Sequence, residues 1–234
     1  MTTLTARPFH LAVFDVAGTT VLDGDAVLDC LRRAVTARVP VSADDVRAVM
    51  GLPKPVAIAE LLRAHQVGSP SLAFEVSAIY EAFRADLLRR YRDDPGIVAA
   101  PEALQVFQAL QQAGICVALD TGFSREILDV LLARLGWEEG EEVDVTVASD
   151  EVDRGRPHPD LIQHAMVLAD VTNPSRVVKI GDTPADLLEG LSAGCGLVVG
   201  VTHGTHTRTE LERPGVHIIE RLSELLPLVG VRER

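Results

Sequence analysis

Short apolar runs rich in valine and isoleucine recur along the chain and alternate with segments of helical periodicity. Runs this continuous are typical of strands that are covered on both faces, as in a parallel sheet. We expect strands at residues 10–14, 115–119, 143–147, 177–180 and 197–201. We expect helices between the later strands, at residues 101–114, 124–136, 159–170 and 184–194. This alternation predicts an α/β fold, a Rossmann-like doubly wound parallel sheet with right-handed crossovers.

One long interval, from Leu22 to Asp94, interrupts this rhythm and shows helical periodicity only. We expect its helices at residues 25–39, 43–50, 56–65 and 71–91. An inserted helical bundle between the first two strands explains the pattern. The predicted organisation is therefore an α/β core made of residues 1–21 and 95–234, with a helical cap at 22–94. The predicted hinges are residues 21–25 and 92–96.

Length, charge and cysteine content limit the function classes. With 234 residues and 47% apolar composition, the chain can bury the core of one large domain carrying a smaller insert. It has no run of about 18 apolar residues and no basic-then-apolar start, which argues against a membrane span or secretory signal. The net charge of −12 argues against nucleic-acid binding, although a metal ion and local cations still permit a small anionic substrate. Three widely separated cysteines indicate reduced thiols of a cytoplasmic protein: Cys30, Cys116 and Cys195.

Polar residues follow four of the predicted strands, at the edge where open α/β sheets bind ligands. They are Asp15, Thr121, Arg156, Asp182 and Asp186. Any one of them fits a turn or a helix cap. Together they gather carboxylates that repel one another unless a cation is present, and oxygen ligands suit magnesium. A carboxylate can also attack phosphorus, while Arg156 and Thr121 hold the phosphoryl oxygens.

These residues carry a resemblance to the haloacid dehalogenase superfamily. The segment FDVAGTT at 14–20 resembles its first motif, and GDTPAD at 181–186 resembles its fourth. Thr121 and Arg156 occupy the places of the second and third motifs, where lysine is the commoner third-motif residue. The resemblance implies the helical cap after the first strand, and it covers nearly the whole chain.

The resemblance also implies roles for individual residues. Asp15 is the implied nucleophile, and Mg²⁺ is implied as the cofactor. The implied metal ligands are Asp15, the carbonyl of Ala17, Asp182 and, in a supporting role, Asp186. The implied substrate-binding residues are Gly18, Thr19, Met50 and Gly122.

Ala17 departs from the usual pattern of the superfamily's phosphatases, which place a second aspartate two residues after the nucleophile. That aspartate protonates the leaving alcohol, and general acid catalysis contributes about 10²–10⁴-fold to rate. The side chain of Ala17 can neither give nor take a proton. Either catalysis has been lost, or the leaving group needs no acid.

The second option matches a phosphonatase-like, or phosphonoacetaldehyde hydrolase-like, subgroup. Its members share the D-x-A-G-T-T motif and cleave a carbon–phosphorus bond with a cap lysine that forms an imine with the aldehyde. The segment MGLPK at 50–54 resembles their cap loop and supplies Lys54. Only one other lysine is present, Lys179, and arginine cannot act as an amine nucleophile. A solvated lysine in a proline-flanked turn is the alternative. The pairing of Lys54 with Ala17 favours a catalytic set of Asp15, Lys54, Thr121 and Arg156.

Three positions differ from characterised phosphonatases and leave the substrate open. Ala57 replaces a histidine that assists proton transfer, Phe123 replaces a tyrosine, and Asp120 replaces a threonine. The expected substrate is therefore phosphonoacetaldehyde or a related small phosphonate or phosphate. A phosphomonoesterase of the phosphoglycolate phosphatase type is the alternative enzyme. A catalytically silent protein that binds a phosphorylated metabolite is the alternative outside enzymes.

Two further expectations concern surfaces. In THGTH at 202–206, we expect His203 and His206 to lie in a surface loop, because a third metal ligand is missing. The helical face of the cap allows a homodimer.

Overall fold

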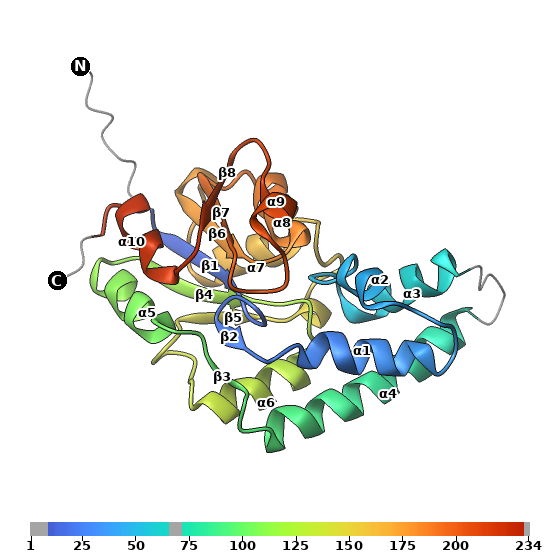
Figure 1. Ribbon diagram of the computed structural model, residues 1–234. Helices are drawn as coiled ribbons and strands as arrows, with labels where there is room; N and C mark the ends of the chain where they lie inside the picture. Colours follow the sequence, from blue (N-terminus) through green and yellow to red (C-terminus); the bar gives the residue numbers. More distant parts are fainter. Residues whose placement is uncertain (1–8, 66–71, 232–234) are drawn as a thin grey trace.

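The computed structural model describes residues 9–65 and 72–231. A six-stranded parallel sheet forms its centre, in the order β5-β4-β1-β6-β7-β8 (Figure 1). The strands are β1 (Leu11–Asp15), β4 (Cys116–Asp120), β5 (Val145–Val147), β6 (Val177–Gly181), β7 (Leu197–Val201) and β8 (Val216–Ile219). The predicted parallel α/β fold is confirmed.

Helices cover both faces of the sheet, as the continuous apolar strands require. Successive residues of a strand point to opposite faces. Accordingly, Phe14 of β1 packs against Phe107 on one face, with ring centroids 5.1 Å apart. Its neighbour Val13 joins a separate apolar cluster with Leu161 on the other face. The covering helices are α5 (Ala103–Gln112), α6 (Arg125–Leu135), α7 (Asp160–Leu168) and α8 (Pro184–Ala193).

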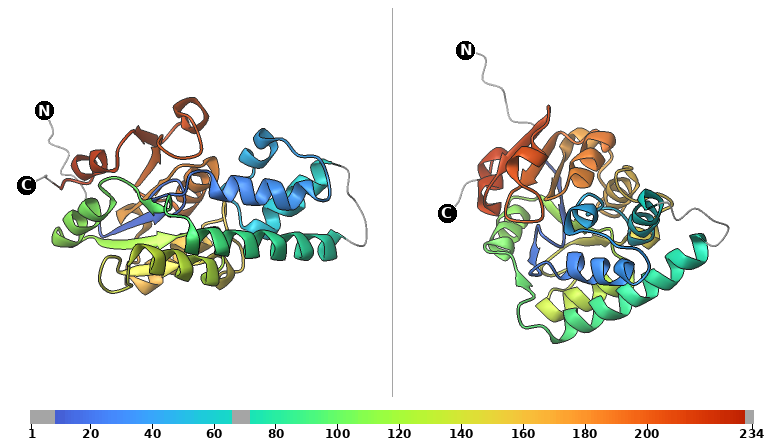
Figure 2. Two further views of the ribbon diagram at one scale, coloured as in Figure 1. Left: turned by 60° about the horizontal axis from the view of Figure 1, so that its bottom comes forward. Right: turned by 45° about the vertical axis from the view of Figure 1, so that its right-hand side comes forward.

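Four further helices form what we call the helical insert: α1 (Ala26–Thr36), α2 (Ala43–Arg47), α3 (Lys54–Ala64) and α4 (Leu72–Asp93). They lie together at one side of the sheet, at the right of Figure 1. Both views in Figure 2 show α4 beside α6, and the two helices are in contact. All four predicted helices of this interval are present. The predicted start of the last one, at residue 71, lies outside the described residues.

Two short strands join the insert to the sheet. β2 (Val21–Leu22) and β3 (Val98–Ala99) pair antiparallel where the chain enters and leaves the insert. The sequence pattern missed both, because two residues are too few to show alternation. It also missed the edge strand β8 and the short helical segments η1 (Ser149–Glu151), η2 (Pro174–Arg176), α9 (Arg208–Leu211), η3 (Leu222–Glu224) and α10 (Leu225–Leu228). None of the described helices is long and apolar enough to cross a membrane.

Candidate active site

The carboxyl ends of the central strands bring the predicted polar residues together. Asp15 ends β1 and Asp120 ends β4, and the two lie opposite each other in the parallel register. Thr121 follows Asp120 and is buried. Its Oγ1 accepts a hydrogen bond from the backbone N–H of Phe123 over 3.2 Å, which fixes the turn after the strand.

Three carboxylates form a compact buried cluster at this edge. One oxygen from each of Asp15, Asp182 and Asp186 lies within 4.8 Å of the others. Burial, followed by the nearby charge of Asp186, raises the pKa of Asp15 to about 8. The same two causes raise the pKa of Asp182 to about 6. These shifts mean that negative charge is under-compensated here, because a buried carboxylate without enough cations retains its proton.

The carboxylate oxygens of this cluster fit a divalent cation as ligands. Oδ1 of Asp186 is buried without a hydrogen-bond partner, although it forms an ion pair with Arg156 over 2.9 Å. Its other oxygen, Oδ2, accepts hydrogen bonds from the N–H and hydroxyl of Thr183, the capping box that begins α8. Asp186 therefore caps the helix with one oxygen and shares the other between the carboxylate cluster and the cation of Arg156. Hard oxygen ligands of this kind suit Mg²⁺.

Arg156 is only 2% exposed, and all three nitrogens of its guanidinium donate hydrogen bonds to the residues around it. Nη1 donates to Asp15, the predicted nucleophile. Nη2 donates to both the side chain and the backbone carbonyl of Asp120. Nε donates to Oε2 of Glu189 over 3.0 Å. A guanidinium held by hydrogen bonds on three sides has a fixed orientation, which a site for phosphoryl oxygens requires.

A second buried cation, Lys179 of β6, shares carboxylate partners with Arg156. Its Nζ pairs with Asp120, with Asp186 at 3.4 Å and with Glu189 at 3.0 Å. The charge of Asp120, expected beside the anion site, is thus paired with two cations, which hold its pKa below the ordinary value although burial opposes them. The sequence analysis missed Lys179 and Glu189 as site residues. A lysine inside a strand covered on both faces was the available signal, because a buried charge must be paired.

The helical insert brings Lys54 to the same place. Lys54 begins α3, is 3% exposed, and donates from Nζ to the carbonyl of Leu52 over 3.2 Å. Nζ also lies 5.3 Å from the ring centroid of Phe123. Burial lowers the pKa of Lys54 to about 8; nearby Asp15 opposes this shift and Arg156 adds to it. The alternative of a solvated lysine is therefore wrong.

Close backbone contact holds the Lys54 loop on the sheet. A Cβ at Gly122 would lie 2.9 Å from the carbonyl oxygen of Leu52 and 3.0 Å from that of Gly51. Only glycine at 122 lets the two backbones approach this closely without displacement.

A cavity of about 20 Å³ lies between the insert and the sheet, with room for roughly one water molecule. Seven of the predicted site residues line it: Asp15, Ala17, Met50, Lys54, Thr121, Gly122 and Arg156. Val27, Gly51, Phe123 and Thr183 complete the lining. Gly18, Thr19, Asp182 and Asp186 do not line it. Asp186 instead pairs with the lining residue Arg156 over 2.9 Å, and the hydroxyl of Thr19 donates to Oδ1 of Asp182 over 3.1 Å.

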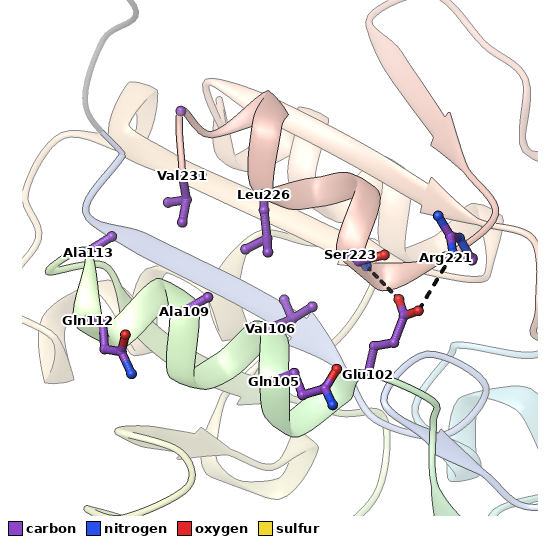
Figure 3. A pocket seen from close by; sticks show the side chains of 11 residues that line it. Glu102, Gln105, Val106, Ala109, Gln112, Ala113, Arg221, Ser223, Leu226 and Val231 are labelled. Carbon is purple, nitrogen blue, oxygen red and sulfur yellow. Dashed lines mark hydrogen bonds and ion pairs between the residues drawn. The ribbon is translucent and has the colours of Figure 1, made fainter. Parts of the chain in front are cut away.

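A larger hollow of about 720 Å³ lies elsewhere, between α5 and the C-terminal segment that contains α10 (Figure 3). Glu102 bridges its two sides, accepting a hydrogen bond from Ser223 N–H at 3.3 Å and pairing with Arg221 at 3.8 Å. None of the predicted site residues lines it. Size alone therefore does not identify the candidate site.

The expectation of a surface loop for His203 and His206 is wrong for His206, which is buried, with its Nδ1 lacking a hydrogen-bond partner. The burial lowers the pKa of His206. His203 is half-buried, and its Nε2 contacts the carbonyl oxygen of Thr19 at 2.8 Å. The loop therefore packs on the site, which the spacing of two histidines alone does not reveal.

Comparison with known proteins identifies the family of this chain. A family model for haloacid dehalogenase-like hydrolases matches residues 9–194. The chain belongs to this family of hydrolases. Its identity is 32% over 199 residues to a phosphonoacetaldehyde hydrolase from Latilactobacillus sakei subsp. sakei (strain 23K), covering 81% of this chain and 74% of that protein. It is 31% identical over 235 residues to a phosphonoacetaldehyde hydrolase from Bacillus cytotoxicus (strain DSM 22905 / CIP 110041 / 391-98 / NVH 391-98), covering 95% of this chain and 83% of that protein.

A solved structure has the same fold as this chain. The structure of a phosphonoacetaldehyde hydrolase-like protein from Oleispira antarctica matches with a TM-score of 0.82. It covers 98% of this chain and 94% of that one at 22% identity, which supports the shared fold. The resemblance inferred from the motifs is confirmed, together with the assignment as a hydrolase.

Proposed function

We propose that this hydrolase cleaves a carbon–phosphorus bond in phosphonoacetaldehyde or a related small phosphonate, using a lysine imine and an aspartyl-phosphate. One observation carries the proposal: Lys54 from the insert and Asp15 from the sheet line one cavity in which position 17 is alanine. The names of the curated relatives support the same reaction. Residues 22–94 act as a cap in this proposal, with residues 1–21 and 95–234 as the core.

The first step belongs to Lys54. Its neutral amine adds to the aldehyde carbon to give a carbinolamine, which takes up one proton from solvent and loses water to give a protonated imine. Asp15 then attacks phosphorus, the carbon–phosphorus bond breaks, and its electron pair forms an enamine as the imine nitrogen accepts electrons. The leaving carbon needs no proton in this step, which explains why Ala17 suffices where a phosphatase requires an acid.

The remaining steps restore both residues. Water attacks the aspartyl-phosphate and releases inorganic phosphate from Asp15. The enamine takes a proton at carbon, and a second water hydrolyses the resulting imine to release acetaldehyde from Lys54. Throughout, the guanidinium of Arg156 and the hydroxyl of Thr121 hold the phosphoryl oxygens.

A divalent cation completes the site in this proposal. Asp15, the carbonyl of Ala17, Asp182 and Asp186 would hold Mg²⁺. When bound, it supplies positive charge that ionises Asp15 and offsets the charge of the phosphonate.

Substrate entry requires the insert to move. A cavity of about 20 Å³ holds roughly one water molecule, far less than any phosphonate. The insert therefore opens to admit substrate and closes to exclude water, as lids commonly do. The paired strands β2 and β3 mark the hinges.

Reductive trapping tests this function. Borohydride added during turnover of phosphonoacetaldehyde should leave a stable alkyl adduct, located by peptide mass spectrometry on Lys54. Lys54→Arg is the matched control, because it keeps the charge and loses the amine nucleophile. Lys179, the only other lysine, gives an internal control since it is fully buried in ion pairs. Turnover without an adduct on Lys54 would remove the imine step.

A phosphomonoesterase of the phosphoglycolate type remains the second candidate. Ala57 is fully buried in α3 and offers no proton-transfer group beside Lys54, which favours a reaction independent of the amine. Turnover of phosphate monoesters that is undiminished in Lys54→Ala supports this candidate over the first. Tight binding of a phosphorylated ligand without phosphate release supports the catalytically silent protein instead.

A further inference from the structure

The loop from Thr202 to Thr207, which follows β7, lies against the carboxylate of Asp182. The backbone N–H of Thr205 donates to Oδ2 of Asp182 over 2.6 Å. On the other side, the hydroxyl of Thr19 donates to Oδ1 over 3.1 Å. Each oxygen of Asp182 thus receives one hydrogen bond from the protein, and each retains a further lone pair for a cation.

His203 ties this arrangement together. Its Nε2 lies 2.8 Å from the carbonyl oxygen of Thr19, and its Nδ1 lies 3.4 Å from that of Glu220. A carbonyl oxygen only accepts hydrogen bonds, so Nε2 is the donor in the shorter contact, to Thr19. His203 therefore links the end of β8 to the segment whose hydroxyl orients Asp182.

Gly204 lets the backbone of the loop approach Asp182 more closely than a residue with a Cβ could. A Cβ at this position would lie 2.3 Å from Oδ2 of Asp182 and 2.3 Å from the carbonyl oxygen of Gly18. Any larger residue would displace the carboxylate or the loop after β1. The close approach explains why Asp182 is fully buried even though it follows the carboxyl end of the central strand β6.

We propose that His203, with Gly204 and the N–H of Thr205, forms a clamp that positions Asp182 for a divalent cation. These are positioning residues, since they act through Asp182. A carboxylate whose orientation is already fixed gives up less freedom when it binds a cation, and hydrogen-bond partners of this kind typically contribute 10–100-fold to metal affinity. The clamp is independent of the imine chemistry, because it concerns the metal site alone.

Calorimetric titration of the full chain with Mg²⁺ alone, without substrate, tests the clamp. His203→Ala should weaken Mg²⁺ binding about tenfold, the lower end of the range for a direct hydrogen-bond partner, because His203 acts through Thr19. His203→Gln, whose side-chain amide can still donate to Thr19, should recover most of the affinity. His217→Ala is the matched control, because His217 is exposed on β8, and it should leave the affinity unchanged. Thermal unfolding in EDTA checks that each variant is folded.

Folded His203→Ala that binds Mg²⁺ within twofold of the parent overturns the clamp, as does His203→Gln that loses as much affinity as His203→Ala. If His203→Ala does not fold, Gly204→Ala replaces it, with the same expected weakening and the same overturning result. Because no substrate is present, a missing adduct on Lys54 leaves this measurement intact. The failure of the proposed reaction and the failure of the clamp are therefore distinguishable.

Discussion

The phenol of Tyr91 donates a hydrogen bond to Oδ2 of Asp23 over 3.2 Å, and so joins the chain entering the helical insert to the chain leaving it. Asp23 precedes α1, and Tyr91 lies near the end of α4. Oδ2 of Asp23 also accepts from the N–H of Val27 over 3.2 Å. The Tyr91 ring packs edge-on against Phe123, with centroids 6.1 Å apart, so this contact adjoins the wall of the cavity.

Tyr91→Phe should therefore destabilise the protein. The substitution keeps the packing against Phe123 but removes one of two donors to Asp23, whose pKa burial raises and these hydrogen bonds lower. Leaving a half-buried acceptor short of a donor costs about 1 kcal/mol. Urea unfolding of the two proteins measures this difference. Tyr80→Phe, the same change at a half-buried tyrosine of α4, should cost less; an equal loss from both variants argues against a specific role for the hydrogen bond.

The sequence predicted the features that repeat along the chain. Strands covered on both faces appear as apolar runs, and the residue after each run lies at the binding edge. This reasoning placed Asp15, Thr121 and Asp182 correctly at the strand ends, because their positions depend on local strand termination alone.

Contacts between distant segments left no local signal. Asp23 and Tyr91 are 68 positions apart in the chain, and each by itself reads as an ordinary surface residue. Glu189 looks like an exposed helix residue until α8 is laid on the sheet, where it meets Lys179. The short strands β2 and β3 pair only because the chain leaves the helical insert next to the place where it enters it.

The amine of Lys54 should titrate near pH 8. Below this value the protonated ammonium is not nucleophilic; as the pH rises through about 8, the neutral amine forms and the rate of reductive trapping should rise and then level off. A lysine with the ordinary pKa of about 10.4 would give a midpoint more than two units higher. Trapping rates across pH 6–11 measure the midpoint, and a free lysine derivative under the same conditions gives the reference midpoint. A midpoint at 10 or above contradicts the buried, desolvated amine.

Asp120→Asn should destabilise the protein strongly. Asp120 pairs with both Arg156 and Lys179, and none of the three is more than 2% exposed. Removing one partner of a buried ion pair costs about 3–5 kcal/mol. We expect the lower end of this range, because Arg156 and Lys179 both keep Asp186 and Glu189 as partners. Denaturant unfolding measures the loss, and Asp153→Asn, at an exposed position, should stay within about 0.5 kcal/mol of the parent.

A double substitution separates charge from packing at this site. Adding Lys179→Met to Asp120→Asn removes the opposite charge while keeping a side chain of similar shape. The double variant should lose less stability than the sum of the two single losses, because each single variant breaks the same Asp120–Lys179 pair; Asp186 and Glu189 still keep Arg156 as a partner. Strictly additive losses would mean that Asp120 stabilises the sheet edge through Arg156 alone.

Ala17→Asp should convert the site towards phosphomonoester hydrolysis. Ala17 lines the same cavity as Asp15 and Lys54, so a carboxylic acid there faces the leaving group. General acid catalysis contributes about 10²–10⁴-fold, and even partly aligned acid should raise monoester turnover about tenfold or more. Phosphate release from a panel of monoesters measures the gain. Ala17→Asn, equal in size but unable to give a proton, should show none; a similar gain from both would place the limitation in cavity shape and not in the missing acid.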